Sequence, residues 1–341
     1  MKRIHQYFQS KEDIQSVIGG INNGLTEQLI AGLTGSARSL LIASVYSSIQ
    51  RPMILITHQL TQAQQLYDDL TVWIDETNVH LYPVNELITS EISIASPELR
   101  SERIQSLSTW LTQNKGILIA PIAALKRMLP PKDYWEKYRL FFKSGEEIDL
   151  EHYLTSFVDM GYERVPMVTT PGEYSIRGGI IDIYPITEEY PLRIELFDNE
   201  VDSIRTFDAD TQRSMEQIQE VFVGPATELL LTEEDMVRGS ERVEKALART
   251  LKKMKASEDK EALFARIDHD IDRLKRLERF DDMNKYTGFL YEEQTSLLDY
   301  LPDNGMIILD EMSRIQETAT SLDVEEAEWH RSLIENKQMV S

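Results

Sequence analysis

An octapeptide near the start of the chain, Gly-Leu-Thr-Gly-Ser-Ala-Arg-Ser over residues 32–39, has the spacing of a phosphate-binding loop without two of its defining residues. The Walker A pattern is G-x-x-x-x-G-K-[S/T]. Gly32 and Ser39 fit this pattern, whereas Ala37 replaces the second glycine and Arg38 replaces the lysine. A Cβ at Ala37 hinders the approach of the backbone to phosphates, and a planar guanidinium does not substitute for a compact ammonium group. The loop predicts a nucleotide-binding fold that no longer handles nucleotide, with an ordinary turn of small residues as the alternative.

The composition excludes several kinds of site. With 36 basic and 58 acidic residues the net charge is −22, which argues against a surface that grips DNA phosphates. The chain has no cysteine, so disulfides, thiolate zinc sites and cysteine nucleophiles are absent. The six histidines are scattered without metal-ligand spacing. We therefore predict no catalytic residue, no metal site and no membrane partner, because no apolar stretch has membrane-spanning length. The expected location is the cytoplasm.

The first predicted domain, residues 1–145, alternates helical and strand patterns. Residues 39–50 have helical spacing, and the short apolar run 52–57 is typical of a buried parallel strand. A further helix over 62–70 and a strand over 116–120 follow. This order predicts an α/β domain with helices on the faces of a parallel sheet.

The second predicted domain, residues 146–224, changes to short strands with polar edges. Residues 192–197 alternate cleanly, which places Arg193, Glu195 and Phe197 on one face of a strand. The segment holds 18 acidic and 5 basic residues, and all five basic residues are arginine. We predict a small, acidic α+β domain with antiparallel strands.

The third predicted segment, residues 225–341, is mostly helical and returns to a strand near its end. Thr232 has the features of a helix N-cap because acidic residues fill the following turn. The later run Met-Ile-Ile-Leu ends in Asp310 and Glu311, the residue types with which a Walker B strand holds magnesium and water. Apolar strands also end in acids for ordinary reasons, so both interpretations stay open.

Several separated segments resemble one family when they are read together. The strongest match is Gly-Glu-Tyr-Ser-Ile-Arg-Gly-Gly-Ile-Ile-Asp-Ile-Tyr-Pro over 172–185, followed by Arg-Ile-Glu-Leu-Phe over 193–197. The loop, the run Pro-Met-Ile-Leu-Ile-Thr-His-Gln from residue 52 and Ile-Ile-Leu-Asp-Glu from residue 307 complete the series. The chain resembles the N-terminal, UvrB-homology region of transcription-repair coupling factors (Mfd). The resemblance implies a degenerate RecA/helicase-like parallel sheet domain, an inserted domain similar to domain 2 of UvrB, and a helical return segment.

Two departures favour Mfd over UvrB. The loop is degenerate at Ala37 and Arg38, although Gly35 is kept. The stretch between Pro83 and Ile104, which includes Glu91, lacks the tyrosine-bearing hairpin that UvrB inserts into damaged DNA. The resemblance therefore implies no enzyme in this fragment, with ATP and magnesium needed only in translocase domains elsewhere in the family protein. We expect Arg38 to bond locally and the acidic pair after the last strand to be a solvated strand end.

The resemblance also implies a partner. Domain 2 is the surface that UvrA recognises, and the matching positions here are Arg177, Arg193 and Phe197. Arginine and aromatic residues are typical of interface hot spots, and acids such as Glu195, Glu200 and Asp202 can orient a basic partner. The alternative is that Phe197 is core and that the arginines only neutralise local acids.

The expected function is recruitment of nucleotide excision repair to stalled RNA polymerase. RNA polymerase and DNA would be bound by other domains, and a C-terminal domain of the same protein would mask the UvrA surface. The competing hypothesis is a UvrB-like ATP-dependent helicase or damage-verification subunit, which would need nucleotide at the loop.

Overall fold

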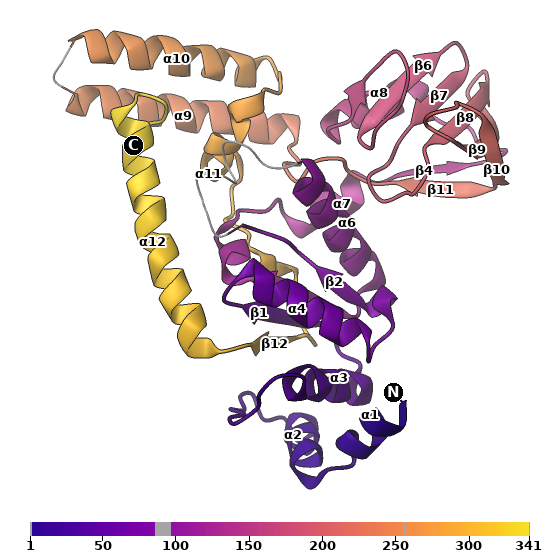
Figure 1. The fold of residues 1–341 in the computed structure, drawn as a ribbon. Helices are drawn as coiled ribbons and strands as arrows, with labels where there is room; N and C mark the ends of the chain where they lie inside the picture. The colour runs from indigo at the N-terminus through magenta and orange to yellow at the C-terminus, as the bar shows by residue number, and fades with distance from the viewer. Residues whose placement is uncertain (1, 86–96, 255–256, 341) are drawn as a thin grey trace. The chain divides into compact units, whose positions relative to one another are not determined.

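The computed structural model describes residues 2–85, 97–254 and 257–340 (Figure 1). The chain divides into two compact units, each of which is described by itself. The first unit comprises Met1–Glu91, Thr109–Arg127 and Ser296–Glu325, and the second comprises Ile92–Ser108, Met128–Thr295 and Glu326–Ser341. Among the described residues, the length and hydropathy that a membrane crossing needs are found in no helix.

The first unit is built around a four-stranded parallel sheet in the order β12-β1-β3-β2. Its strands are β1 (Met53–Thr57), β2 (Val79–Leu81), β3 (Ile117–Pro121) and β12 (Met306–Leu309). Its helices are α1 (Lys2–Gln9), α2 (Glu12–Asn22), α3 (Ala37–Ile49) and α4 (Leu60–Thr71), with 3₁₀ turns η1 (Glu76–Asn78), η2 (Ile122–Lys126) and η4 (Leu297–Tyr300). Helices α6 (Pro97–Gln113) and α12 (Met312–Glu335) contribute residues to both units.

The sequence pattern of the first unit matches its burial. Every residue of β1 is buried, as expected for a strand with helices over both faces of its sheet. Helix α3 follows the glycine loop and buries Leu41 and Val45 in a core with α2, α4 and the sheet. The predicted α/β fold class is therefore confirmed, including the strand at Met306–Leu309, which pairs in parallel with β1.

Strand β12 lies at the end of this sheet. Met306 and Asp310 donate their N–H groups to Pro52 and Ile56 on the β1 side. Because successive N–H groups of a strand point in opposite directions, those of Ile307 and Leu309 point away from β1. These two residues are 47% and 46% exposed. Within the described residues no strand pairs with that outer edge.

The second unit contains a six-stranded sheet in the order β10-β9-β8-β7-β6-β5, in which only the β5–β6 pair is parallel. Its strands are β5 (Glu163–Arg164), β6 (Glu173–Arg177), β7 (Ile180–Ile183), β8 (Leu192–Phe197), β9 (Glu200–Phe207) and β10 (Ser214–Ile218). A separate two-stranded ribbon pairs β4 (Leu140–Lys143) with β11 (Glu220–Val223). The helices beside them are α7 (Lys132–Lys137) and α8 (Leu150–Asp159).

Helix α8 forms the core of this small α+β domain. Its Phe157 is fully buried and its ring lies 5.2 Å from Tyr174 of β6 and 6.4 Å from Phe142 of β4. The ring of Tyr153 packs edge-on against Phe142 at 4.9 Å. One helix therefore joins the inner face of the six-stranded sheet to the inner face of the β4–β11 ribbon.

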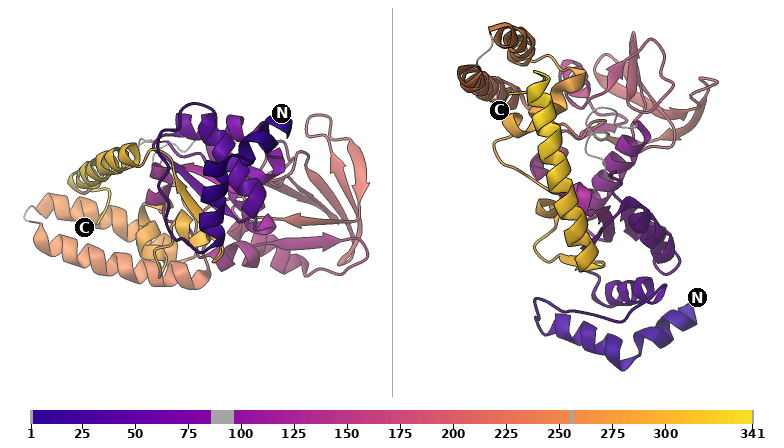
Figure 2. Two further views of the ribbon diagram at one scale, coloured as in Figure 1. Left: turned by 90° about the horizontal axis from the view of Figure 1, so that it is seen from below. Right: turned by 60° about the vertical axis from the view of Figure 1, so that its left-hand side comes forward.

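The rest of the second unit is helical, as predicted. It contains α9 (Glu233–Lys253), α10 (Ser257–Lys275), η3 (Asp281–Tyr286) and α11 (Thr287–Leu290). Helices α9 and α10 lie side by side in all views (Figures 1 and 2). They bury an apolar seam that includes Val243, Leu247, Ile267 and Ile271.

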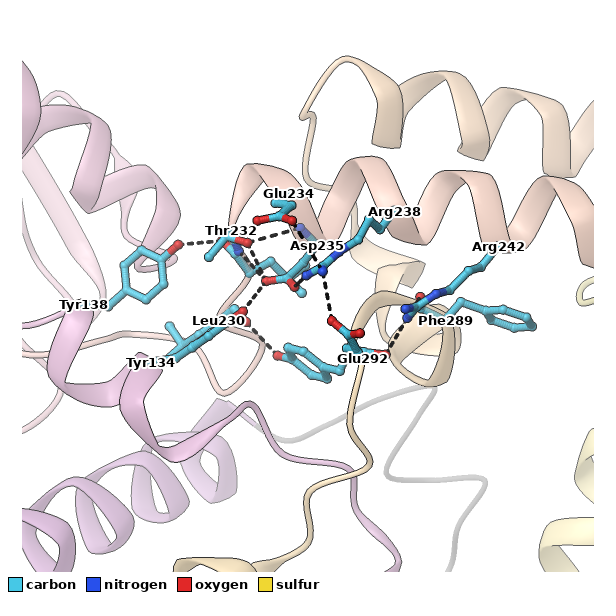
Figure 3. A network of polar contacts seen from close by, with 12 residues as sticks. Tyr134, Tyr138, Leu230, Thr232, Glu234, Asp235, Arg238, Arg242, Phe289 and Glu292 are labelled. Carbon is cyan, nitrogen blue, oxygen red and sulfur yellow. Dashed lines mark hydrogen bonds and ion pairs between the residues drawn. The ribbon is translucent and has the colours of Figure 1, made fainter.

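The start of α9 confirms the predicted cap. Thr232 and Asp235 form a reciprocal capping box, in which each side chain accepts a backbone N–H of the other residue. The hydroxyl of Tyr134 donates to Asp235 Oδ2 at 2.8 Å (Figure 3). Burial raises the pKa of Tyr134 to about 12, so the phenol stays a neutral donor. Arg238 completes the network through Asp235 and Glu292. These contacts fix the helical segment beside α7.

Candidate functional site

Two arginines of the six-stranded sheet converge on one buried carboxylate. Arg193 makes a two-pronged contact with Asp182, with Nε 2.7 Å from Oδ1 and Nη2 2.9 Å from Oδ2. Arg177 also donates from Nη2 to Asp182 Oδ2. Asp182 itself is 1% exposed. The sheet thus presents two guanidinium groups from a single anchored point.

Strand register brings the three side chains together. Asp182 of β7 pairs directly with Arg193 of β8, so both side chains lie on the same face of the sheet. Arg177 ends β6, and the chain turns back into β7 within two residues. Gly178 supports this turn with φ +62°, a conformation that favours glycine.

The environments of the two arginines differ. The Arg193 side chain is only 15% exposed, and its guanidinium lies 4.5 Å above the ring of Phe207. The hydrogen bonds to Asp182 raise the pKa of Arg193 and keep it charged. The Arg177 side chain is 50% exposed. Arg177 is therefore the more accessible of the two to a partner, while Arg193 also holds the buried Asp182 in place.

Phe197 lies at the end of β8 and is 75% exposed. It pairs with Glu200 across the turn to β9, beyond an irregularity in register that follows Glu195. Because three quarters of its surface faces solvent, Phe197 is not a core residue. This exposure leaves the ring accessible to a partner, and aromatic residues are among those enriched in interface hot spots.

Asp182, the carboxylate that binds both arginines, was not among the site residues predicted from the sequence. Glu195, Glu200 and Asp202 are expected from the sequence to orient a basic partner, and no carboxylate was assigned to the arginines, which bind Asp182. Glu195 instead accepts from Ser203 and lies 3.5 Å from Arg205. The available signal was an aspartate inside the apolar run Ile-Ile-Asp-Ile. A charge at such a position is rarely buried without a partner.

The glycine loop has two glycines with positive φ values. Gly32 and Gly35 have φ values of +84° and +54°, and Ala37 is the first residue of α3. Ser39 is fully buried, and its Oγ donates to the carbonyl of Ser36 at 3.0 Å. The hydroxyl that would bind magnesium in a working loop is thus bonded within the loop itself.

Arg38 reaches across to the end of β12. Its Nη1 lies 3.2 and 3.1 Å from the two carboxylate oxygens of Asp310 and 3.4 Å from Glu311 Oε1. Sequence reasoning expected a local bond for Arg38, whereas the partner that it contacts lies 272 positions away along the chain. The expectation of a solvated strand end is wrong for Asp310, which is 7% exposed. Burial raises the pKa of Asp310, and the charge of Arg38 opposes that effect.

The ion pair changes what this site can do. In a working nucleotide site the loop side chain and the strand-end acid bind phosphate and magnesium from opposite sides. Here the two side chains neutralise each other.

The sequence also predicts that the stretch around Glu91 lacks a tyrosine-bearing hairpin. Residues 86–96 lie outside the described residues, so this prediction stays untested.

Comparisons with known proteins identify a domain model and relatives that match this chain. A family model described as UvrB interaction domain matches residues 140–229, which include Arg177, Asp182, Arg193 and Phe197. The chain is 46% identical over 340 residues to a transcription-repair-coupling factor of Bacillus subtilis (strain 168), covering 100% of this chain and 29% of the relative. A transcription-repair-coupling factor of Staphylococcus aureus (strain MRSA252) is 37% identical over 333 residues, with 95% and 27% covered.

The fold and the arginine-bearing sheet define a protein that contains a UvrB interaction domain and a parallel α/β sheet. The chain belongs to the transcription-repair-coupling factor family. It spans less than a third of the length of the relatives it matches.

Proposed function

We propose that this chain is the UvrA-docking module of a transcription-repair coupling factor, with segment boundaries near residues 145 and 224. The observation that carries the proposal is the convergence of Arg177 and Arg193 on Asp182 inside the region matched by the UvrB interaction domain. Two oriented guanidinium groups and an exposed Phe197 have the chemistry of a protein-binding hot spot. Through UvrA the module would bring nucleotide excision repair to stalled RNA polymerase in the cytoplasm.

A direct titration of purified UvrA with this chain tests the proposal. We expect saturable binding with a dissociation constant on the order of 1 μM or lower, typical of a specific protein interface. The interaction should persist at moderate salt, because a surface with two anchored arginines does not depend on long-range charge alone. No saturation at tens of micromolar UvrA would reject the docking function.

The module has no ATPase activity in this proposal. The translocase activity of the family, and contact with DNA and RNA polymerase, would belong to other parts of the full-length protein. A C-terminal domain of that protein would cover the UvrA surface until the motor engages. In that case this chain should bind UvrA more tightly than the full-length protein does.

Calorimetry with ATP and Mg²⁺ should give no binding heat at the glycine loop. Arg38 already neutralises Asp310 at 3.1 Å, so magnesium would have to displace a formed ion pair. The competing UvrB-like helicase requires this site to be open. Micromolar binding of ATP that is lost on Gly32→Trp would revive the helicase hypothesis.

A further inference from the structure

The β4–β11 ribbon carries a second arginine–aromatic cluster. The rings of Phe141 and Phe222 lie 4.6 Å apart on paired positions of the two strands. The guanidinium of Arg139 lies 3.7 Å from the centre of the Phe222 ring. Phe222 is 45% exposed, and Arg139 is also exposed. A charged group stacked on an exposed aromatic ring is a contact that partners readily share.

The alternation of the ribbon explains why these rings face solvent. Leu140, Phe142 and Val223 are buried on the side that faces α8. Side chains at the intervening positions must point the other way, and these are Phe141 and Phe222. The domain core is therefore complete without the outer rings. An exposed phenylalanine that the core does not use points to binding.

The ribbon is continuous with the strands that carry the proposed UvrA site. Gly145 donates its N–H to Val201 of β9, and Val201 donates back to Glu146. Glu147 bridges Glu200, which is the strand partner of Phe197. Phe141 and Glu147 are six Cα steps apart along a segment that turns at Ser144 and Gly145, so at about 3.3 Å per residue their separation is at most roughly 20 Å. A standard interface of about 800 Å² per partner extends across roughly 30 Å.

Charge favours a protein as the partner. The surrounding segment from 146 to 224 has 18 acidic and 5 basic residues, which repels a phosphate backbone. Of the cations near Arg139 in the sequence, Lys137 has its Nζ 5.7 Å from the centre of the Tyr138 ring, and Lys143 is paired with Glu146 at 2.9 Å. Aromatic residues and arginine are enriched in protein interfaces. The group on a partner protein that would complement this cluster is a carboxylate beside an apolar side chain.

We propose that Arg139, Phe141 and Phe222 form a second contact region for the partner that binds Arg177 and Arg193. This inference rests on the proposed UvrA-docking function and extends it. Both regions lie on strand faces turned away from α8, one on the six-stranded sheet and one on the β4–β11 ribbon, and the two meet where Gly145 and Glu146 bond to Val201. Arg139 offers charge to a partner carboxylate while the two rings exclude water around it.

Titration of UvrA with Phe222→Ala and with Arg139→Glu tests the inference. We expect each variant to weaken binding by about tenfold, as for a hot-spot residue. Met215→Ala is the matched control, because Met215 of β10 is 48% exposed outside the cluster. It should bind like the wild type. Circular dichroism checks the fold, and Arg139→Glu decides the matter if Phe222→Ala unfolds.

The outcomes separate this inference from the docking function. If both ribbon variants bind normally while Arg177→Ala binds weakly, the second contact region does not exist and the docking function stands. If wild-type chain does not bind UvrA at all, the docking function fails and the inference falls with it. Equal weakening by Met215→Ala would show a nonspecific apolar effect and would also overturn the inference.

Discussion

Replacing Arg177 and Arg193 together by alanine should weaken UvrA binding by well over tenfold. Truncation of an interface hot spot costs about 2 kcal/mol or more, and each 1.4 kcal/mol is about a factor of ten in affinity. Both guanidinium groups are anchored on Asp182, so little side-chain entropy remains to be lost on binding. Fluorescence or calorimetric titration with purified UvrA measures the effect.

The structure separates a binding loss from a folding loss. Arg177→Ala leaves Asp182 paired with Arg193 through two hydrogen bonds, so this variant should lose affinity and keep its stability. Arg193→Ala removes the main partner of a carboxylate that is 1% exposed, and an uncompensated buried charge is strongly destabilising. The double variant Arg193→Ala, Asp182→Asn should recover stability without recovering UvrA binding.

Arg164→Ala is the control for general charge effects. Arg164 lies on the edge strand β5 of the same sheet and is exposed. Its removal changes net charge as Arg177→Ala does and should leave affinity nearly unchanged. Wild-type affinity in Arg177→Ala and in the Arg193→Ala, Asp182→Asn pair would remove these arginines from the interface.

The second large effect concerns the ion pair that fills the nucleotide site. Arg38→Ala should destabilise the first unit by about 3 kcal/mol, the lower end of the range for breaking a buried pair. The lower end applies because the Arg38 side chain is 23% exposed while that of Asp310 is 8% exposed. Hydrogen exchange of the amides in α3 and β12 measures the local loss. Adding Asp310→Asn should restore most of it.

The effect of Arg38→Ala should depend on pH in a defined direction. Burial raises the pKa of Asp310, and Arg38 lowers it, so removing Arg38 raises that pKa further. A group with a raised pKa binds more protons in the folded state, and its ionisation at higher pH costs stability. The difference between wild type and Arg38→Ala should therefore shrink as pH falls from about 7 to about 5.

Arg314→Ala is the matched control at the same cluster. Arg314 lies 3.2 Å from Glu311, but its side chain is 62% exposed, and exposed ion pairs contribute about 0–1 kcal/mol. A similar small effect for both arginines would mean that the Arg38 pair behaves as a surface contact and does not hold β12 to α3.

Local patterns in the sequence were sufficient for most of the fold. The apolar runs of β1 and β12, the helical spacing of α3 and the acidic first turn after Thr232 each depend on neighbouring residues. The interactions that form these elements are between residues close in sequence, so they can be predicted from a single sequence. The period of two predicts Arg193 and Phe197 on one strand face, and in the structure a register irregularity between Glu195 and Leu196 separates them.

The partners of the site residues could not be found in the same way. Arg38 meets Asp310 across 272 positions, and Asp182 meets Arg193 only because β7 and β8 pair in one particular register. A shift of one residue would move Asp182 to the opposite face. Strand register is a property of the assembled sheet. The pairing of Asp182 with Arg193 could therefore not be predicted from the apolar run that contains Asp182.

The outer edge of β12 has a consequence for handling the protein. No strand among the described residues pairs with the N–H and C=O groups beside half-exposed Ile307 and Leu309, and such an edge is a template on which a strand from another molecule can add. Asp310 at the end of β12 binds Arg38 of the glycine loop, while the outer edge of the same strand stays open to intermolecular pairing. We therefore expect molecules of this chain to associate through β12 at high protein concentration. The substitution Ile307→Lys should reduce this association, because a charged side chain on an edge strand opposes pairing.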